Sequence, residues 1–250
     1  MTTTTQHTAT IDATGLYYRD LNAKIRELAE KGVQRFILTN VYGQRYIGTN
    51  LDKPVEIEIH GTPGNDLGAF MVSARLIVHG NAQDGCGNTM NGGEIIIHGH
   101  AGDIIGLSAR GGKIFVKENV GYRAGIHMKE YLDKRPIIVI GGSAQDFFGE
   151  YMAGGVLIML GLTQKEGYKA KFIGTGMHGG VIYLRGSVES HQVGREVGIA
   201  QLEAKDREIL ETYVREFAAH FDHNADKILK DPFIKIFPRS LRPYGRIYAH

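Results

Sequence analysis

The sequence predicts a mainly β protein, a single-stranded right-handed parallel β-helix of about six to seven coils. The 250-residue chain holds 34 glycines but only 6 prolines and no tryptophan, roughly twice the glycine usage of ordinary proteins. Glycine-containing corners recur every 19 residues, and a short apolar strand follows each one. A unit this short has no room for a helix, and the spacing of leucine-rich repeats is absent. Stacked β-coils remain as the architecture that fits.

Three successive corners define the repeat. They are Asn65–Gly68, Asp84–Gly87 and Asp103–Gly106, and each precedes a pair of small residues and a strand. Later strands at 137–140, 157–160 and 182–185 continue this frame, the first after a polar insertion at 129–135, and a strand at 57–61 enters the stack. Stacked coils repeat the same backbone demand at each corner, and glycine meets it without a Cβ penalty. The predicted structural corner glycines are Gly68, Gly87, Gly92, Gly93, Gly106, Gly111, Gly112, Gly125, Gly149, Gly154, Gly155, Gly174, Gly179 and Gly180.

Alternation along the strands predicts which side chains face the interior. Ile57, Ile59 and Leu76 point inward, whereas Ile77 and Ile96 point outward and need a cover. We therefore expect a further element to pack on the outside of the rod.

Two flanking regions divide the chain into residues 1–52, 53–190 and 191–250. The first is an α/β capping module, with a helix at about 20–31 that begins at the N-cap Asp20, and a strand pair at 34–39 and 45–47 that turns at 42–43. The last contains an amphipathic helix at about 200–221 and a basic, extended tail. Because unpaired strand edges template aggregation, one helical appendage is expected to cap an end of the rod and the other to lie along its side.

The run of Gly-x-x-G corners and Gly-Gly-x-apolar strands from Gly64 to Gly186 resembles the G-x-G-x-G domain, the third domain of glutamate synthase, made as a stand-alone subunit. It is also similar to a scaffold subunit of formylmethanofuran dehydrogenase. The segment 41–47 resembles the one that precedes this domain in free-standing archaeal and bacterial versions. The resemblance implies a non-catalytic β-helix that joins a glutaminase domain to an FMN-containing synthase domain and helps to enclose the ammonia path.

This chain carries neither of those two domains. The partners that the resemblance implies are therefore a glutaminase-type amidotransferase subunit and an FMN-dependent synthase subunit. FMN would be bound by the partner, and no cofactor is expected on this chain. Outward apolar positions also make a homo-oligomer plausible.

Charge and cysteine content exclude several classes of function. The net charge of +2 is too small to indicate nucleic-acid binding. Cys86 is the single cysteine, so neither an internal disulfide nor a cysteine metal cluster can form. No apolar run approaches the roughly 20 residues that span a bilayer. We expect a cytoplasmic protein without a membrane partner.

The segment Gly174–Gly179 satisfies G-x-G-x-x-G, the pattern of dinucleotide-binding loops. Such loops lie between a strand and a helix, whereas another strand follows here, so we interpret these glycines as repeat corners. Neither a Walker sequence nor a G-x-S-x-G elbow occurs. No catalytic residue is predicted.

Three histidines, His60, His79 and His98, share the 19-residue spacing and would stack on the outer face with His100 nearby. Imidazoles about 5 Å apart could hold a metal or mark a partner site. The favoured interpretation is ladder contact between in-register coils, because Lys117 occupies the next rung.

The corner acids Asp66, Asp84, Asp103 and Asp146 could form an acid/base set or a calcium ladder. Calcium-binding rolls repeat every nine residues, so we expect these acids to accept backbone N–H bonds within their own turns. Cys86 could be a nucleophile, but nothing nearby would lower its pKa, and we interpret it as a small corner filler.

The tail from Asp226 to His250 combines basic and aromatic residues and is a docking strap, or else an extended segment packed on its own rod. Pro232, Pro238 and Pro243 argue against a helix there. The sequence as a whole predicts a structural and channelling subunit of a glutamate synthase-like complex. The alternatives are a scaffold of a formylmethanofuran dehydrogenase-type one-carbon complex and a self-sufficient enzyme.

Overall fold

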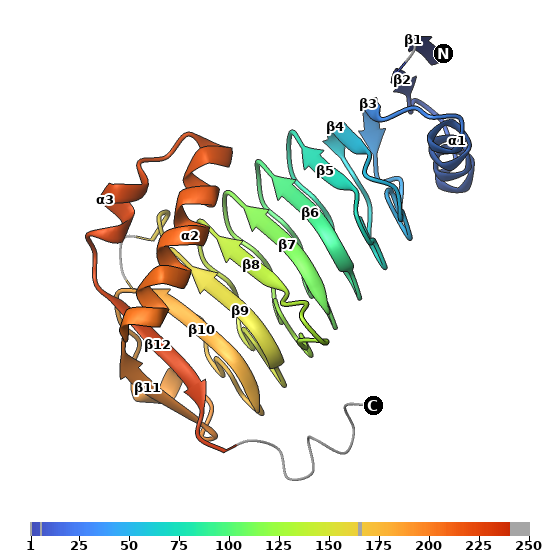
Figure 1. Ribbon diagram of the computed structural model, residues 1–250. Coiled ribbons are helices and arrows are strands. Elements are labelled where there is room, and N and C mark those ends of the chain that lie inside the picture. The colour runs from blue at the N-terminus through green and yellow to red at the C-terminus, as the bar shows by residue number, and fades with distance from the viewer. Residues whose placement is uncertain (1, 6, 165–166, 241–250) are drawn as a thin grey trace.

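The protein is a parallel β-solenoid of about six turns, which confirms the predicted fold class. The computed structural model describes residues 2–5, 7–164 and 167–240, with side chains from residue 7 onward. Figure 1 shows the strands stacked one above another along the rod, with α1 near the N-terminal end and α2 on one face.

One twelve-stranded sheet runs through the described residues, in the order β1-β2-β3-β4-β5-β6-β7-β8-β9-β10-β12-β11. Strands β2 to β10 pair in parallel, and the outermost pairs at both ends are antiparallel. The strands are β1 (Thr2–Thr5), β2 (Thr8–Asp12), β3 (Arg35–Tyr42), β4 (Glu56–Thr62), β5 (Arg75–Val78), β6 (Asn91–Ile97), β7 (Gly111–Val116), β8 (Ile137–Ile140), β9 (Ala153–Met159), β10 (Gly179–Arg185), β11 (Val197–Gln201) and β12 (Phe233–Pro238). The helices are α1 (Tyr18–Glu30), a short 3₁₀ turn (Ser190–Gln192), α2 (Ala204–Phe221) and α3 (Ala225–Leu229).

Rows of aliphatic side chains fill the interior of the solenoid. Each strand contributes two inward residues, as the alternation predicts, and none of them is more than 1% exposed. The two rows are Ile57, Leu76, Ile95, Ile114, Ile138, Leu157 and Ile182, and Ile59, Val78, Ile97, Val116, Ile140, Met159 and Leu184. The rod is therefore a packed core and not a tube.

Each corner bends through residues with positive φ at alternating positions. At one corner Ile104, Gly106 and Ser108 have φ of 52°, 66° and 54°, while Ile105 between them is buried. A Cβ on Gly106 would lie 2.3 Å from Cδ1 of Ile138, so only glycine fits beneath the following coil. A left-handed conformation costs a β-branched residue such as Ile104 about 1–3 kcal/mol. Hydrogen bonds between neighbouring coils, among them Ile104 N to Tyr122 O at 2.8 Å, offset that cost.

The N-terminal region differs in detail from the prediction. Helix α1 begins at Tyr18 after the N-cap Tyr17, whose side chain makes no cap bond, so the assignment of Asp20 as N-cap was wrong. The predicted strand pair was also wrong, because β3 pairs in parallel with β4 and residues 45–47 form no strand. The helix packs its buried residues against the same core as β2 and β3, which closes this end of the solenoid.

The C-terminal region covers the other end and one side. Helix α2 starts later than predicted, because residue 200 belongs to β11. The tail holds the short helix α3, contrary to the expectation of no helix. Strand β12 then pairs antiparallel with β10 and places Phe233 and Ile236 in the core, so this part of the tail packs on its own rod. Residues 241–250, which complete the predicted strap, lie outside the described residues.

A buried polar cluster anchors α2 to the sheet. The hydroxyl of Tyr183 on β10 donates to Oδ1 of Asp206 at 2.7 Å, and Nζ of Lys235 on β12 donates to its Oδ2 at 2.8 Å. The same carboxylate accepts the N–H of Glu203 at 2.9 Å, which completes a capping box. Burial tends to raise the pKa of Asp206, but the bonds from Lys235 and Tyr183 outweigh it and lower the pKa. Asp206 therefore fixes both the start and the docking of α2.

Candidate functional site

The outer face of the sheet is divided into a covered and an uncovered half. Its central row, in strand order, is Ile37, Glu58, Ile77, Ile96, Phe115, Val139, Ile158 and Tyr183. The residues from Ile96 onward are buried against Leu210, Val214, Phe217 and Phe221 of α2. Figure 1 shows α2 over this part of the sheet and no helix in front of β4 and β5. The predicted need for a cover is thus met for Ile96, whereas Ile77 is only half-buried.

A ladder of alternating charge crosses the uncovered half. In register from β3 to β7 it runs Arg35, Glu56, Arg75, Glu94 and Lys113. Arg75 contacts both neighbouring glutamates, with N–O distances of 2.8 Å each. Lys113 ends the ladder on Glu216 of α2 at 2.7 Å. The sequence analysis missed this ladder, although the alternating signs at a spacing of 19 residues from Glu56 to Lys113 could have revealed it.

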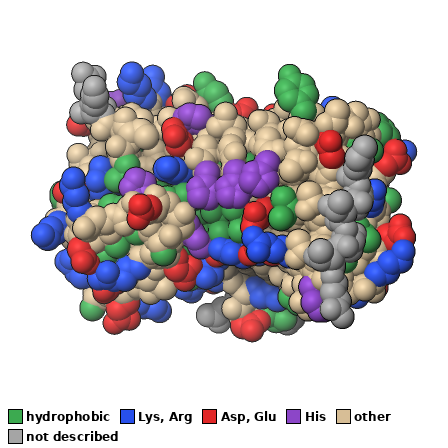
Figure 2. All heavy atoms as spheres, turned by 90° about the horizontal axis from the view of Figure 1, so that it is seen from above, with side chains coloured by type: hydrophobic (Ala, Val, Ile, Leu, Met, Phe, Trp, Pro, Cys, Tyr) green, Lys and Arg blue, Asp and Glu red, His purple; other side chains and the backbone are tan. Residues whose placement is uncertain are grey.

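The predicted histidine ladder forms beside the charge ladder. The rings of His60 and His79 stack with centroids 4.6 Å apart, and those of His79 and His98 stack at 5.3 Å. His98 also meets Phe221 of α2 edge-on at 5.1 Å. Figure 2, which looks at the molecule from above the view of Figure 1, shows histidine side chains gathered in a row. The ladder therefore runs from the uncovered half to the end of α2.

Glu58 lies between the first two rungs of the histidine ladder. Its Oε2 is 3.9 Å from Nε2 of His60 and 3.9 Å from Nε2 of His79. Its Oε1 accepts a hydrogen bond from the guanidinium of Arg35. Among the described residues, these three form the group of histidine and acidic side chains whose geometry could hold a metal ion.

Near the C-terminal end of α2, His220 lies beside the charge ladder, and His98 is the last rung of the histidine ladder. Nε2 of His220 lies 3.5 Å from Oε1 of Glu94, an ion-pair distance. Burial would raise the pKa of Glu94, but His220 and Arg75 outweigh it and hold the pKa at about 2. Burial, together with the charges of His79, Lys117 and His220, lowers the pKa of His98. Glu94 thus keeps its charge, while His98 resists protonation.

The corner acids bond to the next coil and not to their own turn, which corrects the sequence interpretation. Oδ1 of Asp84 accepts the N–H of Asp103, and Oδ1 of Asp103 accepts that of Tyr122, both at 2.8 Å. Asp146 does the same with Lys171 at 2.8 Å, whereas Asp66 accepts from the side-chain amide of Asn88 at 3.0 Å. These carboxylates therefore join each coil to the next by hydrogen bonds.

Cys86 and the Gly174–Gly179 segment serve the coil geometry. Cys86 is buried in the inward corner position, where burial and the nearby Asp66 and Asp84 raise its pKa to about 12, so it is a poor nucleophile. Gly174 and Gly176 have positive φ at a corner, and β10 follows them instead of a helix. The dinucleotide-binding alternative therefore lacks its helix N-terminus.

An aromatic cluster on the corner face was not predicted. The ring of Phe147 stacks on Phe172 with centroids 4.9 Å apart, and the guanidinium of Arg123 lies 4.5 Å over Phe147. Nearby, His127 stacks on Tyr151 at 5.5 Å. Insertions shift Phe147, Tyr151 and Phe172 out of the 19-residue frame, which hides the cluster in the sequence.

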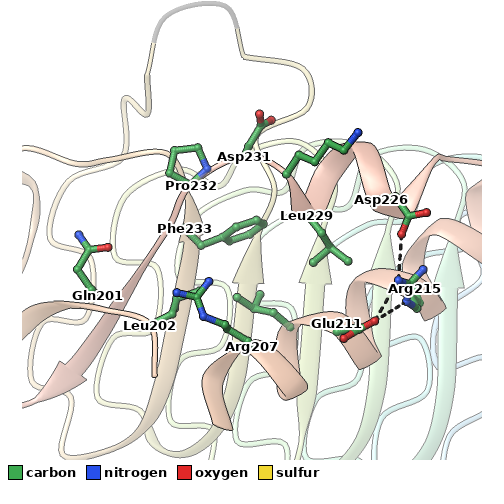
Figure 3. Close-up of a pocket in the computed structure, with 12 residues that line it drawn as sticks. Gln201, Leu202, Arg207, Glu211, Arg215, Asp226, Leu229, Asp231, Pro232 and Phe233 are labelled. Atoms are coloured by element: carbon green, nitrogen blue, oxygen red, sulfur yellow. Dashed lines mark hydrogen bonds and ion pairs between the residues drawn. The ribbon is translucent and has the colours of Figure 1, made fainter. Parts of the chain in front are cut away.

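A hollow of about 870 Å³ lies between α2, α3 and β12. Leu202, Leu229 and Phe233 contribute its apolar walls. In Figure 3 Arg215 lies between two carboxylates, with Glu211 at 3.0 Å and Asp226 at 2.9 Å. Its basic side chain is therefore already paired, and Arg207, Lys230 and Asp231 also line the hollow.

Comparison with known proteins agrees with the repeat and the fold. The family described as GXGXG motif matches residues 21–239. The chain belongs to the GXGXG motif family. This supports the predicted resemblance to the third domain of glutamate synthase. The chain is also similar to a protein of Methanocaldococcus jannaschii named "Uncharacterized protein MJ1350", with 48% identity over 249 residues, which covers 96% of this chain and 95% of that protein.

The family match in this GXGXG chain extends from α1 to β12, and so includes the helices that flank the repeat. The relative matches over nearly its whole length, so it shares both flanking regions. No helix in the described part of the chain is long and apolar enough to cross a bilayer.

Proposed function

We propose that this GXGXG chain is the structural and channelling subunit of a glutamate synthase-like complex in nitrogen and amino-acid metabolism. A glutaminase-type amidotransferase subunit would release ammonia, and an FMN-dependent synthase subunit would consume it. The observation that carries the proposal is the family match over residues 21–239. The proposal includes a cytoplasmic setting, which the single cysteine supports because disulfide-free chains are typical of reducing compartments.

The packed interior restricts where an ammonia path could run. The inward rows of the coils are at most 1% exposed and leave no channel along the rod axis. A path that uses this subunit must therefore follow its outer surface and be closed by a partner. This makes the subunit a wall of the path and not the conduit itself.

The uncovered half of the outer sheet face is the surface that we propose for partner contact. It combines the half-buried Ile37 and Ile77 with the charge ladder and the exposed rings of His60 and His79. Apolar positions surrounded by polar groups are typical of recognition surfaces. The covered half is already occupied by α2.

Purification of the tagged chain from its native cell at low salt, followed by mass spectrometry and a flavin absorbance scan, tests the proposal. We expect an amidotransferase and a flavin-containing synthase, and glutamine-dependent amination of a 2-oxo acid that falls when the chain is stripped from the complex. Recovery of a molybdenum or tungsten enzyme would instead support the alternative of a formylmethanofuran dehydrogenase-type scaffold. Glutaminase or amination activity of the chain alone would overturn the scaffold role.

A further inference from the structure

We propose that Glu58, His60 and His79 form a divalent metal site that takes Zn²⁺, with one coordination position open to water. The three donor atoms, one from each side chain, lie within 4.8 Å of one another. Two imidazole nitrogens and one carboxylate oxygen form a common donor set for zinc in proteins. The inference stands independently of the proposed complex, because all three ligands come from this chain.

The distances between these donor atoms are slightly longer than those in a zinc site. Each Nε2 lies 3.9 Å from Oε2 of Glu58, which is too long for a hydrogen bond. Zinc binds nitrogen and oxygen at about 2.0–2.2 Å, so tetrahedral ligands lie roughly 3.3 Å apart. A contraction of less than about 1 Å at each Glu58–histidine pair would bring these donors to that separation. The imidazoles can make this movement, because their side chains are 47% and 39% exposed.

The backbone already holds the two histidines close together, with His60 on β4 and His79 directly after β5. The strand pairing of β4 and β5 puts Glu58 opposite Ile77, and the N–H of His79 donates to the carbonyl of Ile59 at 2.9 Å. The two rings are nearly parallel, with 14° between their planes.

Arg35 orients the carboxylate of Glu58 by binding Oε1, and this leaves Oε2 toward the histidines. Such outer-shell contacts position metal ligands in known sites. The positive charge of Arg35 does not dominate the surroundings. Arg35 and Arg75 lie among the carboxylates of Glu56, Glu58 and Glu94, which offset the charges of the two guanidinium groups.

The third rung of the ladder provides an internal contrast. In the row of Glu58, the positions beside the later rungs are Ile77 and Ile96, so no carboxylate of that row faces His98. His98 packs instead on Phe221. The proposed site is thus confined to the first two rungs, and His98 is a matched control.

The test uses untagged protein that has been freed of metal by a chelator and then dialysed. One sample is titrated with Zn²⁺ in competition with a chromophoric chelator. A second sample is titrated with Co²⁺, and its visible spectrum is recorded. The wild type is expected to bind one equivalent with a tetrahedral or five-coordinate Co²⁺ spectrum. His79→Gln and Glu58→Gln should each weaken Zn²⁺ binding by more than about 10-fold, the lower end of what outer-shell changes alone can cost. His98→Gln should bind within about twofold of wild type.

Circular dichroism of each variant verifies the fold, which these partly exposed positions are not expected to disturb. Failure of the wild type to bind Zn²⁺ stoichiometrically would overturn the assignment. Equal loss in His98→Gln and His79→Gln would contradict the ligand set, because binding would then depend on the ladder and not on Glu58. Unchanged binding in Glu58→Gln would contradict it as well.

Discussion

The covered and uncovered halves of the outer sheet face share one backbone frame and differ only in side chains. Under α2 the central row is apolar and buried, with Phe115, Val139 and Ile158 at 0% exposure. On β4 and β5 the same row holds Glu58 and Ile77, flanked by paired charges and stacked histidines. The repeat thus builds the rod uniformly, and the outward residues decide which part becomes a helix-binding core and which part remains a surface.

The largest expected contrast comes from removing an aromatic anchor of α2. Phe217→Ala empties a fully buried position in the covered half and should lower the free energy of unfolding by about 3–5 kcal/mol. Ile77→Ala, at a half-buried position of the central row on β5, should cost about 1 kcal/mol of unfolding free energy. Urea unfolding of both variants measures the difference. Equal losses would mean that α2 does not protect its half of the face as the packing indicates.

The next effect concerns the polar anchor of α2. Tyr183→Phe removes the hydrogen bond to the charged Asp206 and should cost about 1.5–3 kcal/mol of unfolding free energy. Tyr213→Phe is the control, because Tyr213 lies on α2 and packs against the same apolar cluster, and it should change stability by less than about 0.5 kcal/mol. Thermal or urea unfolding distinguishes them. Equal losses of unfolding free energy in the two variants would mean that the hydrogen bond to Asp206 does not anchor α2.

His98 marks the boundary between the halves and should make stability depend on pH. Its folded-state pKa is lowered, so the unfolded chain takes up the proton more readily. Unfolding free energy should therefore fall as the pH drops through the unfolded value of about 6.5. His98→Gln should flatten this part of the profile, as urea unfolding at a series of pH values would reveal. An unchanged slope, or an NMR titration of His98 above the ordinary value, would contradict the burial argument.

The smallest effect is expected for the charge ladder. Arg75→Gln breaks two partly exposed ion pairs and should cost less than about 1 kcal/mol. The cost should shrink further in about 1 M salt, where the screening length is about 3 Å. Unfolding at low and high salt tests this. A large, salt-independent loss would mean that the ladder supports the fold and is more than a surface feature.

The sequence predicted the repeat well because its cause is local and periodic. A 19-residue spacing of glycines and alternating aliphatic residues determines the corners and the inward rows, so strands such as 137–140 fall where expected. Where the period was broken, prediction failed. Residues 35–42 lie outside the 19-residue repeat, and β3 was taken for half of a hairpin, whereas it pairs in parallel with both β2 and β4.

The site was predictable only in part, because it depends on which coils are neighbours. The histidine spacing revealed the ladder, but the role of Glu58 required the register of β4 and β5. The corner acids likewise appeared to serve their own turns, since the sequence alone does not show that the N–H of the next coil lies closer. Non-glycine residues with positive φ, such as Ile104, were also hidden, because stacking compensates for their intrinsic cost.

The central claim is that the uncovered half receives the partner subunits of a glutamate synthase-like complex. The most direct test compares recovery of an amidotransferase and a flavin synthase with the tagged wild type, Ile77→Arg in the uncovered half and Thr212→Arg on the exposed side of α2. Circular dichroism first verifies that both variants fold. The account predicts loss of the partners with Ile77→Arg and full recovery with Thr212→Arg. Full recovery with Ile77→Arg, or absence of both partners from the wild type, would contradict it.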